Sequence, residues 1–266
     1  MSRASSNLGA RWTRAIAPPV ITFVVIAAVA ELAIRLLNVP AYLLPLPSEV
    51  VSTAWNVRGN LAASLLTTAS AAMIGFVASI VAGILIAIAL SGSRLVRQAL
   101  YPYTIFFQTV PVVAVAPLLV IWFGAGVQSV AICAFIVSVF PVITNTLAGL
   151  LSTDPALKDL FQLYGARPFA TLIKLKLPSA TPDIVTGMRI AAGLAVIGTI
   201  VGEFVAAVLQ GNPGLGVMVM EARKLGRTDQ VFAAILAASA LGLVMFGAVS
   251  LAGHLLLRHW HASART

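Results

Sequence analysis

Six long apolar segments, each near the length that crosses a lipid bilayer, dominate this sequence. An α-helix rises about 1.5 Å per residue, so about 20 apolar residues span the roughly 30 Å of hydrocarbon. The segments lie at 18–37, 61–90, 101–123, 127–151, 184–209 and 231–257. Within lipid, a helix satisfies all its own backbone polar groups. The sequence therefore predicts an all-α polytopic membrane protein with about six transmembrane helices.

The composition agrees with this class. Hydrophobic residues make up 60% of the chain and charged residues only 9%, whereas a soluble domain carries about 25% charged residues. The net charge of +9 is spread between apolar segments and forms no shared patch, so we expect a lipid bilayer and no nucleic acid as partner. The single cysteine, Cys133, lies within an apolar segment and predicts a buried thiol, without a disulfide.

The basic residues set the expected orientation, because Lys and Arg gather in the cytoplasmic connections of membrane proteins. With the N-terminus inside, only five of the 17 basic residues fall outside: Arg35, Arg58, Arg223, Lys224 and Arg227. We expect one transmembrane domain at 18–257, cytoplasmic tails at 1–17 and 258–266, and a cytoplasmic loop at 152–183.

The first apolar segment allows a second interpretation. It follows Arg11 and Arg14, and the stretch Ala28–Glu31 has the small residues of a signal-peptide cleavage site. Because the apolar character continues through Leu37, an uncleaved first helix is favoured.

The loop at 152–183 has the pattern of two short amphipathic helices. Its first half repeats one apolar face at helical spacing, formed by Leu157, Leu160, Phe161 and Tyr164. Gly165 follows as a helix-ending residue, and Pro168 is suited to open a second helix. Pro178 is expected to close that helix, because the residue before a proline avoids helical geometry. Such a unit offers an apolar face to a partner.

This loop resembles the cytoplasmic coupling loop of the permease subunits of type I ABC importers, with the pattern E-A-A-x3-G-x9-I-x-L-P. After Gly165 and nine further residues comes Leu-Lys-Leu-Pro, whereas Asp-Leu-Phe stands where Glu-Ala-Ala is usual. The resemblance implies that this loop sits in a groove of a separate ATP-binding cassette ATPase. We expect Leu160, Phe161 and Tyr164 to make apolar docking contacts and Gly165 to fix the bend; a surface loop that packs only on its own bundle is the alternative. The full set of expected coupling residues is Asp159, Leu160, Phe161, Tyr164, Gly165, Leu175, Leu177 and Pro178.

Five further segments resemble the nitrate, sulfonate and taurine branch of these permeases: 43–51, 108–126, 140–150, 202–207 and 211–222. The resemblance implies a homodimer in the bacterial plasma membrane, working with an extracytoplasmic solute-binding protein. Its cargo would be a nitrate, sulfonate or taurine-like solute, and a pyrimidine or riboflavin precursor is the alternative. A self-contained secondary transporter or channel is a further class, disfavoured because we find no internal repeat.

The energy for uphill transport is expected from another chain. A phosphate-binding loop of the form G-x-x-x-x-G-K-[ST] needs a lysine directly after a glycine. None of the four lysines follows one: Lys158, Lys174, Lys176 and Lys224. We therefore expect no enzymatic activity and no cofactor, and His259-x-His261 alone is too weak a pattern to indicate a metal site.

Polar residues within the apolar segments are candidates for the solute route. Glu203 lies near the outer third of its segment, where an ionisable residue is costly and so indicates a function; bonding within the bundle is the alternative. Gln108 and Asn145, close to Pro111 and Pro141, are further candidates, although interhelical hydrogen bonds of about 0.6 kcal/mol would also explain them.

Two further patterns predict contacts. Glu31 and Arg35 stand four residues apart on one helix, a spacing that favours a local ion pair near the outer surface. Gly198 and Gly202 form a small-residue face that allows close helix approach, either to a second subunit or within the chain. The glycines and proline at 211–216 predict tight turns outside the membrane.

Overall fold

The computed structural model describes residues 6–207 and 213–257, and that part of the chain contains helices and turns but no strand. The outermost tail residues, His259, His261 and the start of the segment 211–216 lie outside the described residues. The helices are α1 (Ser6–Leu36), α2 (Pro47–Asn56), α3 (Arg58–Gly92), α4 (Arg94–Thr109), α5 (Val112–Phe123), α6 (Val127–Leu151), α7 (Pro155–Leu163), α8 (Pro168–Thr171), α9 (Leu177–Ala206), α10 (Leu215–Lys224) and α11 (Thr228–Leu257).

Five helical segments are long and apolar enough to cross a membrane, and α5 is a shorter apolar helix. The spans lie at 17–36, 58–92, 127–151, 168–206 and 228–257, close to the segments expected from the sequence. The all-α polytopic fold is therefore confirmed. Helix α1 begins at Ser6, so residues 6–17, expected as a tail, extend the first helix.

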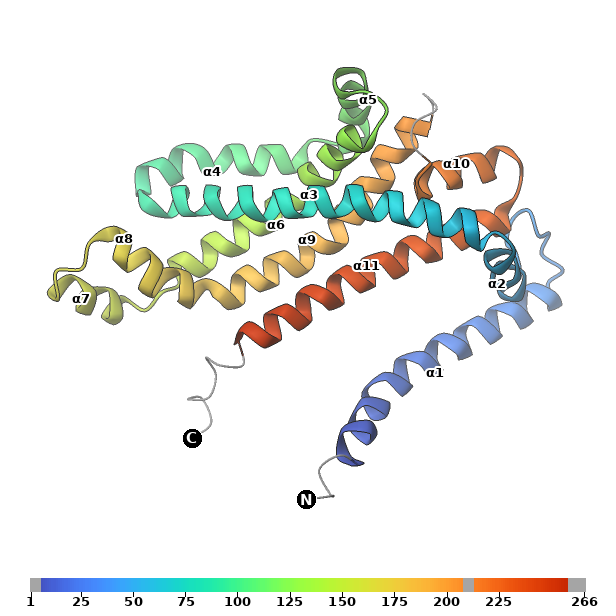
Figure 1. Cartoon of the computed structure of the whole chain (residues 1–266), viewed down its shortest axis with the longest axis horizontal. Coiled ribbons are helices and arrows are strands. Elements are labelled where there is room, and N and C mark those ends of the chain that lie inside the picture. The colour runs from blue at the N-terminus through green and yellow to red at the C-terminus, as the bar shows by residue number, and fades with distance from the viewer. Residues whose placement is uncertain (1–5, 208–212, 258–266) are drawn as a thin grey trace.

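The third expected span, 101–123, is wrong as a single helix. The chain leaves helical geometry at Val110, where ψ is 120°, and Pro111 separates α4 from α5. A proline lacks the N–H of a helical hydrogen bond and pushes the preceding residue into an extended conformation. Figure 1 shows the result: α4 runs beside α3, and α5 turns away from it.

The core consists of α3, α6 and α9, which lie side by side along the long axis, with α11 beside α9 (Figure 1). Small residues let these helices approach closely. A Cβ added to Gly198 would lie 2.8 Å from the carbonyl oxygen of Cys133 on α6. The face of Gly198 and Gly202 therefore packs within the chain. Cys133 is fully buried, as expected.

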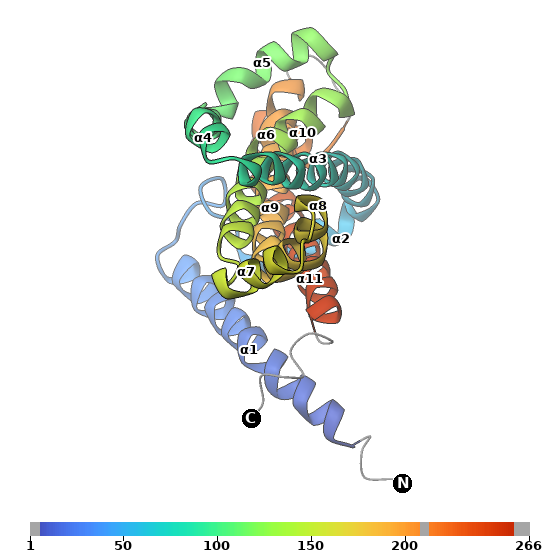
Figure 2. The same cartoon turned by 90° about the vertical axis from the view of Figure 1, so that its left-hand side faces the viewer.

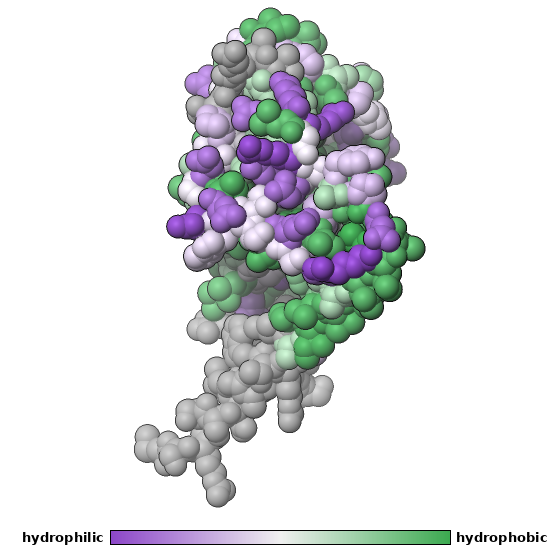
Figure 3. All heavy atoms as spheres, turned by 90° about the vertical axis from the view of Figure 1, so that its right-hand side faces the viewer, coloured by the Kyte–Doolittle hydropathy of each residue, from purple (hydrophilic) through white to green (hydrophobic). Residues whose placement is uncertain are grey.

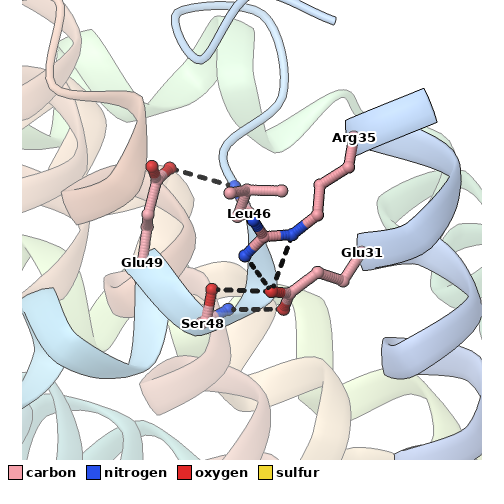
Figure 4. A network of polar contacts seen from close by, with 5 residues as sticks. All are labelled: Glu31, Arg35, Leu46, Ser48 and Glu49. Carbon is pink, nitrogen blue, oxygen red and sulfur yellow. Dashed lines mark hydrogen bonds and ion pairs between the residues drawn. The ribbon is translucent and has the colours of Figure 1, made fainter. Parts of the chain in front are cut away.

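Helix α1 stands apart from the bundle along most of its length (Figure 2). Its end is attached to the start of α2 through Glu31, as Figure 4 shows. The Arg35 guanidinium lies 2.6 Å from the Glu31 carboxylate, which confirms the expected ion pair. The same carboxylate accepts hydrogen bonds from the backbone N–H and the hydroxyl of Ser48, at 3.2 and 3.0 Å. One carboxylate thus joins two helices.

The end of the bundle that carries α2 and α10 is polar. Figure 3 shows hydrophilic side chains gathered on this end, whereas the flank below it is hydrophobic. Exposed charged residues of this end include Glu49, Arg58, Glu221, Arg223, Lys224 and Arg227. A polar end above apolar spans marks a surface that meets water.

Candidate functional site

Two short helices, α7 and α8, project from the opposite end of the bundle (Figure 1). Asp154 starts α7, because its carboxylate accepts the N–H of Ala156 at 2.8 Å and Pro155 occupies the first turn. Gly165 ends α7 with φ +67°, a conformation that costs glycine nothing. Pro168 opens α8. The expected pair of helices joined at Gly165 is confirmed, and we name residues 155–171 the coupling arm.

The coupling arm exposes a large apolar surface. None of the residues of α7 and α8 is buried, and the exposed fractions of Leu163, Tyr164 and Phe169 are 86%, 81% and 71%. Leu160 and Asp159 are exposed as well, whereas Phe161 is half-buried. Apolar side chains gathered in this way usually mark a contact with another protein or with the membrane. The sequence analysis did not predict Leu163 and Phe169, because neither belongs to the apolar face from Leu157 to Tyr164 on which it relied.

Two further predicted coupling residues, Leu175 and Leu177, lie against the bundle and not on the exposed surface of the coupling arm. Leu175 is buried, and Leu177 packs on the cluster of Leu90, Ile143 and Ala180 inside the bundle. These side chains attach the coupling arm to the core.

Pro178 does not close the second short helix, so that expectation is wrong. A π-helical turn (Leu172–Lys176), in which the N–H of Leu177 bonds to the carbonyl of Leu172, carries the chain from α8 into α9. Pro178 is the second residue of α9 and directly follows this π-helical turn, so the chain stays helical through the proline. The expected loop is accordingly shorter, and Pro168–Ala206 forms one continuous helical segment.

Gln108 lies at a cavity within the membrane-spanning region. The cavity measures about 250 Å³ and is lined by α4, the start of α5, α6 and α9, including Val112, Phe140, Pro141 and Leu194. Gln108 and Phe140 also line a neighbouring apolar cavity of about 660 Å³. Of the three predicted route residues, Gln108 lines both of these cavities.

Asn145 takes a different position. Its side-chain amide donates a hydrogen bond to the Pro141 carbonyl at 2.8 Å, one turn earlier in α6. Its Cβ lies beside Gly187, where a Cβ added to the glycine would approach it to 2.9 Å. Asn145 therefore lies where α6 meets α9.

Glu203 is 2% exposed and joins three helices. Its carboxylate accepts the Thr68 hydroxyl of α3 at 2.8 Å and the N–H of Gly216 at 2.7 Å. The N–H of Leu215 donates to the Thr68 hydroxyl oxygen at 2.8 Å. A carboxylate at a helix N-terminus satisfies free N–H groups and the helix dipole. Glu203 thus caps α10, and the cavity that it touches holds only about 10 Å³.

We expect Glu203→Leu to lower the free energy of unfolding by about 3 kcal/mol, because the Thr68 hydroxyl and the Gly216 N–H lose their acceptor inside the protein. Thermal unfolding of the purified protein in detergent measures this loss. Glu203→Gln keeps one acceptor oxygen and should lose less. Glu221→Leu, at an exposed position of α10, is the control. Equal unfolding temperatures for Glu203→Leu and the wild type would contradict the capping role.

Comparison with known proteins identifies the class. Residues 79–258 match the family model of the binding-protein-dependent transport system inner membrane component. This match covers more than half of the chain, so the chain belongs to that family. The fold is similar to a chain from the crystal structure of an amino acid ABC transporter with histidines, with a TM-score of 0.57 and 16% identity over 78% of this chain and 97% of that one.

Two curated relatives narrow the class. The chain is 35% identical over 240 residues to the formylaminopyrimidine transport permease protein ThiX of Halalkalibacterium halodurans, covering 90% of this chain and 94% of the relative. It is 30% identical over 227 residues to the putative aliphatic sulfonates transport permease protein SsuC of Bacillus subtilis, covering 85% and 80%. The resemblance to type I ABC importer permeases of the sulfonate and taurine branch is confirmed, and a self-contained transporter or channel is set aside.

Proposed function

We propose that two copies of this permease form the route by which a small solute enters a bacterial cell, with both chain termini in the cytoplasm. A separate ATPase binds the coupling arm, and a solute-binding protein binds the polar end at α2 and α10. The observation that carries the proposal is the coupling arm: an exposed apolar surface, outside the bundle, that continues without a break into α9.

The continuity of Pro168–Ala206 supports a mechanical role for the coupling arm. The segment passes from the arm through the close contacts of Gly187 and Gly198 with α6, and reaches Glu203, which caps α10. When the ATPase subunits close on ATP, a displacement of the arm moves α9 against α6. Because packed helices switch between discrete arrangements rather than deform smoothly, this displacement reaches the outer end of the bundle.

Two solute classes have support. The similarity to SsuC favours an alkyl sulfonate, and the similarity to ThiX favours an aminopyrimidine. The solute-binding protein supplies much of the selectivity in such a system, so the permease alone distinguishes the two classes weakly.

Reconstituted transport tests the proposal. We expect proteoliposomes that contain the permease with its ATPase, supplied with the solute-binding protein, to accumulate either taurine or formylaminopyrimidine only when ATP is present. A catalytically inactive ATPase is the control and should abolish accumulation. Accumulation by the permease alone, without nucleotide, would disprove the proposed energy source.

A further inference from the structure

One face of α6 lines two cavities in succession. Val137 and Pro141 line the 250 Å³ cavity that contains Gln108. Thr144, Ala148 and Leu151 continue the same helical face and line a second cavity of about 470 Å³. Residues spaced three or four apart share one side of a helix. The two cavities therefore follow one line along α6, from the middle of the bundle toward the end that carries the coupling arm.

Helix α4 covers the same line from the other side. Arg97, Gln98 and Tyr101 line the second cavity, and Gln108 lines the first. Arg97, Tyr101 and Gln108 lie within about 40° of one another around the helix, because the spacings of four and eleven residues are close to whole turns. Figure 1 shows α4 running from the coupling-arm end toward the middle of the bundle. Together, α4 and α6 line the second cavity from two sides.

The second cavity contains a cation without a counter-ion. Arg97 is half-buried and lines the cavity, and none of the lining residues is acidic. In the described part of the chain, the Arg97 guanidinium has neither an ion pair nor a hydrogen bond. A charge in a cleft with low-dielectric walls produces a focused potential that attracts ions of the opposite sign. The planar guanidinium is also suited to bind two oxygens of one anion.

We propose that the second cavity is an inner solute site that receives the sulfonate group of a small alkyl sulfonate, with Arg97 as its cationic ligand. As a step of import, this inference rests on the proposed function, and it favours the sulfonate class over an aminopyrimidine, which offers no negative charge to Arg97. The cavity is open, so an anion held by a single guanidinium can leave toward the cytoplasm. Weak binding is what an exit site requires.

The native chain provides a clean background for the test. Cys133 is its only cysteine and is fully buried, so labelling measured on the permease chain reports on a cysteine placed at Thr144. The complete transporter in inside-out vesicles is treated with two thiol reagents of similar size, the anionic sulfonatoethyl and the cationic trimethylammonioethyl methanethiosulfonate. Relative to the rates of both reagents with a free thiol in solution, we expect Thr144→Cys to favour the anionic reagent. Adding Arg97→Gln should lower the anionic-to-cationic rate ratio by about tenfold, because the attracting charge is lost.

Arg94→Gln is the matched control. Arg94 lies three residues earlier on α4, is exposed, and lines none of the cavities described here. The proposal predicts that Arg94→Gln leaves the rate ratio unchanged, and that excess ethanesulfonate slows the anionic reagent only when Arg97 is present. An unreactive Thr144→Cys, a ratio unaffected by Arg97→Gln, or an equal fall with Arg94→Gln would each overturn it.

Failure of this site is distinguishable from failure of the proposed function. The reagent ratio requires no ATP and no transport, so it tests the Arg97 site even if the transporter imports neither solute. Conversely, Arg97→Gln could leave the anionic-to-cationic rate ratio unchanged while ATP-driven accumulation persists. That result would support the import function and contradict the anion site. Taurine uptake that falls with Arg97→Gln but not with Arg94→Gln would support both.

Discussion

Tyr164→Asp is expected to reduce ATP-driven solute uptake by about 100-fold while the permease remains folded in the membrane. The side chain is 81% exposed in the isolated chain, so the substitution removes no packing there. In the complex with the ATPase, the new carboxylate would be buried in an apolar contact, and a central interface side chain is commonly worth 2 kcal/mol or more. Copurification of the ATPase and uptake into proteoliposomes measure the two consequences.

Gln162→Asp is the control for this prediction. Gln162 is an exposed polar residue of α7, two residues before Tyr164, so the same charge enters the same part of the coupling arm at a position without an apolar side chain. We expect it to keep most of the uptake. If Tyr164→Asp retained ATPase binding and transport at the level of Gln162→Asp, the apolar surface of the coupling arm would not be the site of ATPase docking.

Gly198→Ala is expected to destabilise the bundle by about 3 kcal/mol, the upper part of the range for overpacked cores. Its Cβ would lie 2.8 Å from the carbonyl oxygen of Cys133 and 2.9 Å from the Cα of Ala134, and both are backbone atoms that cannot rotate away. Helices α6 and α9 would have to separate. A lower unfolding temperature in detergent and a lower yield of membrane-inserted protein are the measurements.

Gly193→Ala provides the comparison on the same helix. No atom outside the local backbone lies within 4 Å of a Cβ at this position. Alanine favours helices over glycine by about 1 kcal/mol, so this variant should be as stable as the wild type or slightly more stable. Equal unfolding temperatures for the two variants would show that α6 and α9 do not meet as closely as the structure indicates.

Local sequence patterns predicted the coupling arm well. The apolar stripe through Leu160 and Tyr164, the glycine at 165 and the proline at 168 specify two short helices through nearby interactions alone. The same reasoning failed at Pro178, because a proline ends one helix or begins another by the same local rule. The π-helical turn that joins α8 to α9 decides between these two outcomes.

The sequence by itself determined that this chain crosses the membrane several times, where most of its helices lie and which family it belongs to, since length, apolarity and local motifs carry that information. Only the tertiary structure decided the roles of the polar residues within the spans. A span that is apolar on every side has no periodicity to indicate its inward face. The packing of the helices therefore decides where each polar residue lies. It places Gln108 and Arg97 at cavities, Asn145 where α6 meets α9, and Glu203 at the start of α10.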